Sequence, residues 1–170
     1  SSRAVQSTHE SNGTGTVKFG NVRSIVNREG HTIVMNRNAE LTLHDETGRE
    51  KEKYALPYGA RLHTEDGTKV KAQTLLAEWE PFAVPVLAEF AGKVQFADIK
   101  EGATMQDQVD EFTGINRRVI IESRDATLKP RVVIKAGKEE STYHMPVSAN
   151  LSVDDGVEVL PGDVLARIPR

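Results

Sequence analysis

Apolar residues fall into short runs along almost the whole chain, as in Ile33–Met35, Val119–Ile121 and Val132–Ile134. Each run has the length of a strand and is rich in β-branched side chains, and turn signals such as Thr47-Gly48, Asp66-Gly67 and Ala136-Gly137 separate the apolar segments. A sustained period of 3.6 residues, typical of helices, is missing. The pattern therefore predicts a mostly β chain. Strands are also expected in two ambiguous segments, 75–79 and 104–112.

A long stretch of this pattern occurs twice. Shifting the sequence by 89 positions places residues 54–79 on residues 143–168 without a gap, and nine positions are then identical. A second match places residues 15–22 on residues 92–99, but at a shift of only 77 positions. The second copy therefore carries 12 extra residues, which we expect in loops because loops tolerate insertions best.

The repeat predicts two small β units in tandem. Residues 1–13 are polar and small and are expected to form a flexible lead-in. We expect unit 1 at residues 14–80, a linker at 81–89 and unit 2 at 90–169.

The repeated residues describe a scaffold. Asp66-Gly67 and Asp155-Gly156 each predict a tight hairpin turn with positive φ at the glycine. The valine three residues later and the leucine six further on are expected in the core. Since packing accounts for every repeated residue, none of them has to be catalytic.

Motifs for catalysis, cofactors and metals are missing from the sequence. There is no cysteine, no Gly-x-Ser-x-Gly elbow, no phosphate-binding glycine loop, and no metal-ligand spacing among the five histidines. We therefore expect no catalytic, cofactor-binding or metal residues in this chain, and no small-molecule substrate. The longest uncharged apolar run, 83–88, is much shorter than the ~18 residues of a membrane helix, so no membrane contact is expected.

The charge is balanced along the chain. The net charge is −3, with 11 basic and 11 acidic residues up to residue 85 and 11 and 14 after it. Strong electrostatic binding of the chain to nucleic acid is therefore not expected. The middle of the second copy is locally basic and forms a candidate contact surface for nucleic acid or an acidic protein face: Arg117, Arg118, Lys129, Arg131, Lys135 and Lys138. The competing interpretation, outward-facing strand side chains, is the commoner one.

The segment Val159–Ile168 resembles the opening half of biotinyl and lipoyl carrier domains. Such carriers modify a lysine in the hairpin that follows, but the equivalent stretch of the first copy, 72–92, contains no lysine. The resemblance therefore predicts a barrel-sandwich hybrid fold without a carrier function.

A wider resemblance covers essentially the whole chain. Its motifs resemble, in order and spacing, the lineage-specific insertion in the trigger loop of the β′ subunit of proteobacterial DNA-directed RNA polymerases: Ser2–Ala4, Thr16–Val22, Asn36–Leu41, Leu56–Ala60, Gly92–Phe96, Asp110–Gly114 and Gly162–Pro169.

This resemblance implies two tandem sandwich-barrel hybrid domains in a bacterial, cytoplasmic enzyme. The catalytic aspartates and the magnesium of the polymerase would lie outside the chain, and residues 1–13 would be a tether to the trigger loop. Expected partners are other regions of β′ and β, with transcript-cleavage factors and downstream DNA as further candidates.

The implied function is to change the balance between the open and the folded trigger loop, and so elongation, pausing and transcript cleavage. Two alternatives remain: a stand-alone β module that binds a protein or is a carrier-like domain without its lysine, and a direct nucleic-acid binder.

Overall fold

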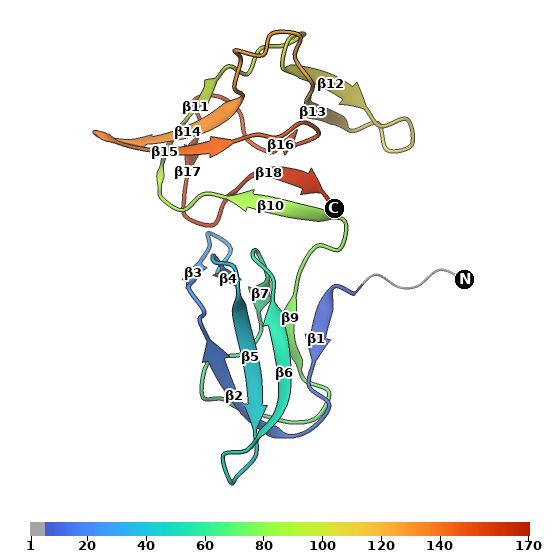
Figure 1. Cartoon of the computed structure of the whole chain (residues 1–170), viewed down its shortest axis with the longest axis vertical. Helices are drawn as coiled ribbons and strands as arrows, with labels where there is room; N and C mark the ends of the chain where they lie inside the picture. Colours follow the sequence, from blue (N-terminus) through green and yellow to red (C-terminus); the bar gives the residue numbers. More distant parts are fainter. Residues whose placement is uncertain (1–5) are drawn as a thin grey trace. The chain divides into compact units, whose positions relative to one another are not determined.

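The computed structural model describes residues 6–170, and the part of the expected lead-in at residues 1–5 lies outside them. The described chain forms eighteen strands in four antiparallel sheets and contains no helix (Figure 1). The prediction of an all-β fold is therefore confirmed. Within the described residues no helix could cross a membrane.

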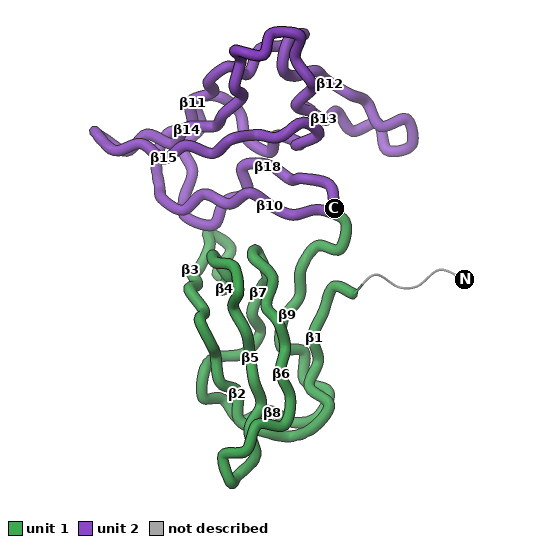
Figure 2. Tube along the Cα trace, viewed as in Figure 1, with its two compact units in different colours: residues 1–82 green, residues 83–170 purple. Residues whose placement is uncertain are grey.

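The chain divides into two compact units, the first ending at Phe82 (Figure 2). Unit 1 has a five-stranded sheet in the order β1-β9-β7-β4-β3 and a four-stranded sheet in the order β6-β5-β2-β8. Its strands are β1 (Thr8–Glu10), β2 (Gly15–Gly20), β3 (Ser24–Val26), β4 (Thr32–Val34), β5 (Ala39–His44), β6 (Glu50–Leu56), β7 (Arg61–Leu62), β8 (Lys69–Val70) and β9 (Leu75–Glu78).

Unit 2 runs from Ala83 to Arg170. Its sheets have the orders β10-β18-β16-β13-β12 and β15-β14-β11-β17. Its strands are β10 (Ala83–Leu87), β11 (Gly92–Ala97), β12 (Met105–Val109), β13 (Asn116–Ile120), β14 (Arg131–Ala136), β15 (Glu139–His144), β16 (Asn150–Leu151), β17 (Glu158–Val159) and β18 (Val164–Pro169).

The two units share one topology. Adding nine to each strand number of unit 1 gives the strand order of unit 2, in both sheets. Register agrees as well, because β1 and β10 each carry an irregularity at the same point, between His9 and Glu10 and between Val86 and Leu87. The sequence repeat therefore corresponds to a repeat of the whole unit.

Two expected boundaries differ from the structure. Strand β1 lies inside the predicted lead-in, and β10 lies inside the predicted linker 81–89. Both are outermost strands of their sheets. The polar segment of β1 gave no sequence signal of a strand, as an edge strand needs no apolar alternation. The segment of β10 is an apolar run that tolerates Pro85 at an edge, and it was placed in the linker because the repeat match begins only at residue 92.

Each unit has its own core of Leu, Ile, Val and Ala side chains. The predicted core positions Val70, Val159, Leu76 and Leu165 are all buried, and both leucines are fully buried. Burying one such side chain contributes about 1.5–3 kcal/mol.

The Asp-Gly turns have the predicted positive φ, 86° at Gly67 and 89° at Gly156, but they do not close hairpins. In unit 1 the turn connects β7 of one sheet to β8 of the other. The aspartate is repeated for a further reason: Oδ1 of Asp66 accepts a hydrogen bond from the backbone N–H of Phe19 at 2.9 Å, and Asp155 does the same for Phe96 at 2.9 Å. Each bond joins the turn to the strand β2 or β11.

The extra residues of unit 2 lie in three places. The connection from β11 to β12 spans residues 98–104, whereas the equivalent one from β2 to β3 spans 21–23. The β12–β13 hairpin has five-residue strands where β3 and β4 have three. The connection from β13 to β14 spans residues 121–130, whereas the equivalent one in unit 1 spans 35–38. Part of the insertion thus extends strands as well as loops.

Candidate functional site

The six predicted basic residues are distributed over both sheets of unit 2. Arg117 and Arg118 lie on β13, and Arg131 and Lys135 lie on β14 of the other sheet. Lys129 precedes β14, and Lys138 lies in the turn between β14 and β15. Neighbouring residues of a strand face opposite sides of its sheet, so even Arg117 and Arg118 do not share a face.

Arg118 is bound within its own unit. Its guanidinium donates a hydrogen bond to the Val153 carbonyl at 2.6 Å, pairs with Asp154 at 2.9 Å, and lies 5.9 Å from the ring centroid of Phe96. These contacts hold the segment after β16 against the unit. Arg118 is therefore a packing residue in this structure.

Asp98 joins two more of the basic residues. Its Oδ2 accepts hydrogen bonds from the Lys129 backbone N–H at 2.9 Å and from the Arg131 guanidinium at 3.2 Å. These interactions, the Lys129 bond first, hold the pKa of Asp98 below its usual range. The cluster fastens the long 121–130 connection to the end of β11.

Lys135 pairs with Glu140 at 3.3 Å and Arg117 with Asp110 at 3.8 Å. Four of the six predicted residues thus have a carboxylate beside them, which reduces the charge available to phosphates. Contact through these six residues stays a prediction.

Sequence reasoning missed an exposed apolar feature of unit 2, the tip of the β12–β13 hairpin. Three apolar side chains are exposed there: Val109 at 63%, Ile115 at 57% and Phe112 at 99%. The available signal was a phenylalanine inside a turn sequence, between Glu111 and Thr113. Most apolar residues of a β chain occupy buried strand positions, so the sequence alone did not indicate that Phe112 is exposed.

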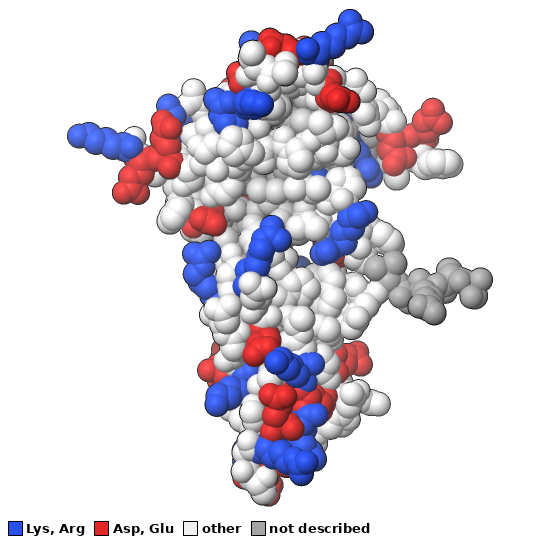
Figure 3. Space-filling view, in the orientation of Figure 1, with Lys and Arg blue, Asp and Glu red and all other residues white. Residues whose placement is uncertain are grey.

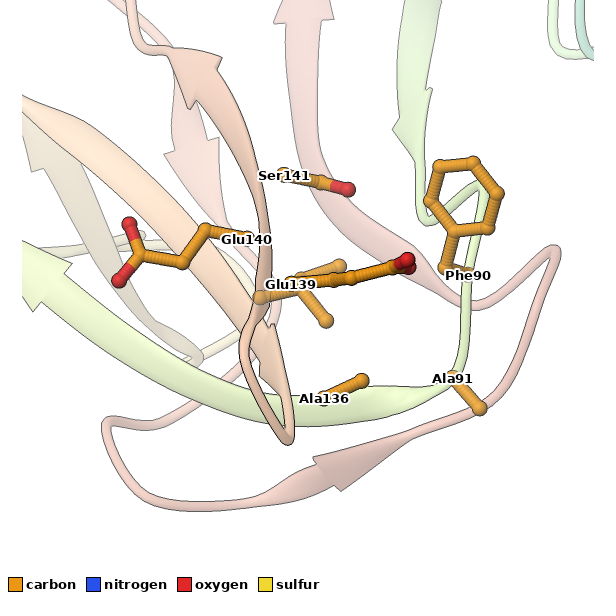
Figure 4. A pocket seen from close by; sticks show the side chains of 7 residues that line it. Phe90, Ala91, Ala136, Glu139, Glu140 and Ser141 are labelled. Carbon is orange, nitrogen blue, oxygen red and sulfur yellow. The ribbon is translucent and has the colours of Figure 1, made fainter.

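A pocket of about 290 Å³ lies between the β10–β11 connection and the β14–β15 hairpin (Figure 4). The figure shows the Glu139 side chain directed toward Phe90 and the Glu140 side chain directed away from it. The residues that line the pocket are Phe90, Ala91, Ile134, Ala136, Glu139, Glu140 and Ser141.

The two copies differ at one residue that lines the pocket. Ser141 faces Ile134 in the ladder just as Glu52 faces Leu43 in unit 1. In unit 1 the Glu52 carboxylate accepts hydrogen bonds from the backbone N–H groups of Asn12 at 2.7 Å and Gly13 at 3.0 Å. The serine side chain is shorter than that of glutamate, and in unit 2 it lines the pocket.

Among the described residues, no cluster of three or more His, Asp or Glu side chains is arranged to hold a metal ion. Fold and surface together define a duplicated all-β module whose distinctive features, the extended hairpin and the pocket, both lie in its second unit.

Comparison with known proteins then identifies what this module is similar to. No protein-family model matches the chain. It is 47% identical over 165 residues to the DNA-directed RNA polymerase subunit beta' of Koribacter versatilis (strain Ellin345), an alignment that covers 97% of the chain and 12% of that protein. It is also 47% identical over 165 residues to the same subunit of Syntrophobacter fumaroxidans (strain DSM 10017 / MPOB), with 92% of the chain and 12% of that protein covered. The chain is therefore homologous to a segment of the RNA polymerase β′ subunit.

Proposed function

We propose that the chain is a non-catalytic module inserted in the trigger loop of a bacterial RNA polymerase β′ subunit, and that it changes the balance between the open and the folded loop. The observation that carries the proposal is that nearly the whole chain is similar to a segment of each β′ subunit, and this segment is about 12% of the length of that subunit. The motif order described above supports the trigger loop as the place of insertion, and the same motifs support two sandwich-barrel hybrid domains.

The strand arrangement suits an insertion. In each unit the first strand is the antiparallel neighbour of the last, so that Thr8 faces Glu78 and Ala83 faces Pro169. The chain thus enters and leaves each unit at neighbouring positions on one edge of a sheet. Inserting such a unit into a host loop costs little closure entropy, because that cost grows slowly with loop length.

The mechanism requires different contacts in the two states of the loop. A module that binds neighbouring surfaces equally well in both states shifts nothing, whereas a difference of about 1.4 kcal/mol shifts the equilibrium tenfold. Under this proposal other regions of β′ and β are the partners, with transcript-cleavage factors as further candidates. The catalytic aspartates and the magnesium of this cytoplasmic enzyme lie outside the chain.

The test is to replace residues 6–170 in the polymerase by a short Gly-Ser linker. Single-nucleotide addition, pause escape and transcript cleavage are then timed against the intact enzyme. We expect nucleotide addition to continue with altered pause and cleavage rates. Unchanged rates in all three assays would refute the proposal, and complete loss of nucleotide addition would point to a direct catalytic part.

A further inference from the structure

The tip of the β12–β13 hairpin exposes apolar surface that the fold does not require. Phe112 is 99% exposed, and Val109 and Ile115 flank the same turn. Figure 1 shows this hairpin projecting from one side of unit 2, opposite to the β14–β15 hairpin. A single exposed apolar side chain is ordinary on a protein surface, but Phe112 and Ile115 lie together in one turn and are both more than half exposed, and grouped exposed apolar residues mark interaction sites.

Unit 1 builds the equivalent turn, one residue shorter, without apolar residues inside it, although Val26 precedes that turn as Val109 precedes the turn of unit 2. There the N–H of Asn27 bonds the His31 carbonyl at 2.9 Å and the N–H of Gly30 bonds the Asn27 carbonyl at 3.0 Å. Arg28 and Glu29 occupy the exposed positions of that turn. The equivalent hairpin of the other copy therefore shows that the turn forms with polar residues at its tip.

In unit 2 Asp110 takes the place of Asn27. Its N–H bonds the Ile115 carbonyl at 3.0 Å, and its carbonyl accepts from the Gly114 N–H at 2.8 Å. Its Oδ1 accepts hydrogen bonds from the N–H groups of Phe112 at 2.8 Å and Thr113 at 3.1 Å. Four bonds thus hold the tip in one conformation, which lowers the entropy cost of binding through Phe112.

The charge around the tip narrows the class of partner. Residues 107–115 include three acidic residues and no basic one, and the nearby Arg117 and Arg118 of β13 are paired with Asp110 and Asp154. Asp107 and Glu111 are exposed, while Asp110 is paired with Arg117. Figure 3 shows acidic side chains beside uncoloured surface at this end of unit 2. Nucleic acid would be repelled by such a tip, whereas a basic protein surface would be attracted.

We infer that the β12–β13 hairpin is a docking element, with Phe112 as the anchor that enters an apolar protein pocket rimmed by basic side chains. The inference rests on the proposed function, since the pocket would belong to another part of the same polymerase. Three apolar side chains bury little area, so the contact is weak between separate molecules. Within one enzyme the tether supplies a high effective concentration, and a weak contact that can form and break is what a population shift requires.

The test uses the complete polymerase with the variants Phe112→Ser and Phe112→Leu. Truncating an anchor residue commonly costs more than 1 kcal/mol, so we expect Phe112→Ser to change the pause lifetime about fivefold, in the same direction as deletion of the module. Phe112→Leu keeps an apolar anchor and should stay close to the intact enzyme. Val26→Ser is the matched control, because Val26 lies on the equivalent hairpin of unit 1 and is 66% exposed.

A second measurement places the photocrosslinker p-benzoylphenylalanine at position 112 of the elongating enzyme. A crosslink to a polymerase segment that contains apolar and basic residues supports the inference. A crosslink to DNA or RNA, a crosslink to a second polymerase molecule, or no crosslink overturns it. If deletion of the module alters pausing while Phe112→Ser does not, the docking element is refuted and the proposed function stands. If deletion alters nothing, the proposed function itself fails.

Discussion

Glu52 and its counterpart Ser141 illustrate how single residues separate the two copies. The Glu52 carboxylate ties the β1–β2 connection to β6 through the N–H groups of Asn12 and Gly13, and it accepts a hydrogen bond from the Tyr54 hydroxyl. Burial, followed by that bond, raises the pKa of Tyr54 to about 12. In unit 2 a serine takes this place and lines the pocket.

We expect Glu52→Gln to destabilise unit 1 by about 1–2 kcal/mol at pH 7, because it removes bonds to a charged acceptor. Burial tends to raise the pKa of Glu52, but the bonds from Tyr54, Asn12 and Gly13 outweigh it and lower that pKa below the ordinary 4.5. A carboxyl with a lowered folded-state pKa stabilises the fold above pH 4.5, and the contribution is lost as pH falls through the folded-state value.

Urea unfolding at pH 7 and pH 3 measures this effect. The difference between Glu52→Gln and the original chain should shrink at pH 3. Glu50→Gln, at an exposed position of the same strand, is the control. A Glu52→Gln chain as stable as the original at pH 7 would contradict the account.

Thr104 is a second residue on which unit 2 depends. It is fully buried, its hydroxyl donates to the Asp98 carbonyl at 2.6 Å, and it accepts from the Lys100 N–H at 2.8 Å. Thr104→Val keeps the shape but leaves both partners unsatisfied, so we expect a loss of about 1–3 kcal/mol. Thermal unfolding checks this, with the exposed Thr68→Val as control. Equal melting temperatures for the two variants would show that the bonds carry no net stability.

At the scale of elements, the two hairpin turns should be interchangeable for folding. Replacing residues 110–115 by the unit 1 turn sequence Asn-Arg-Glu-Gly-His, which is one residue shorter, should change the stability of unit 2 by less than about 1 kcal/mol, since both turns are closed by a backbone bond between their first and last residues. Denaturant unfolding of the full chain measures the change. A larger loss would mean that the apolar tip stabilises its own unit.

Sequence patterns predicted the interior strands well, because β-branched runs such as Val132–Ile134 are buried on both sides of their sheet. The edge strand β1 was missed, since an edge strand needs no apolar alternation, whereas β10 was visible as an apolar run and only its membership of unit 2 was missed. The Asp-Gly turns were assigned to hairpins because local sequence fixes the turn and not the sheet that the next strand joins.

Prediction of the candidate surface was limited because a side chain's partners can come from distant parts of the chain. A run of basic residues is visible in the sequence, but the carboxylates that pair with Arg118 and Arg131 come from residues 154 and 98, far away along the chain. Exposure of Phe112 depends on where the hairpin ends, which is equally non-local.

At the scale of the whole molecule, separate cores predict separate unfolding. Leu165→Ala should destabilise unit 2 by about 2–5 kcal/mol and leave the unfolding of unit 1 unchanged, and Leu76→Ala should do the reverse. Hydrogen exchange resolved by residue measures both units in one sample. A loss of protection spread equally over both units would show that they unfold as one, and would contradict this division.

The pairing of first strand with last strand in each unit also has a genetic consequence. A copy of the coding segment placed in frame at such a point adds a complete unit and interrupts no existing strand pairing. Duplication could therefore give a folded product in a single event, before any further substitution. Later changes, such as serine at 141 or phenylalanine at 112, could then accumulate in one copy while the other kept the original arrangement.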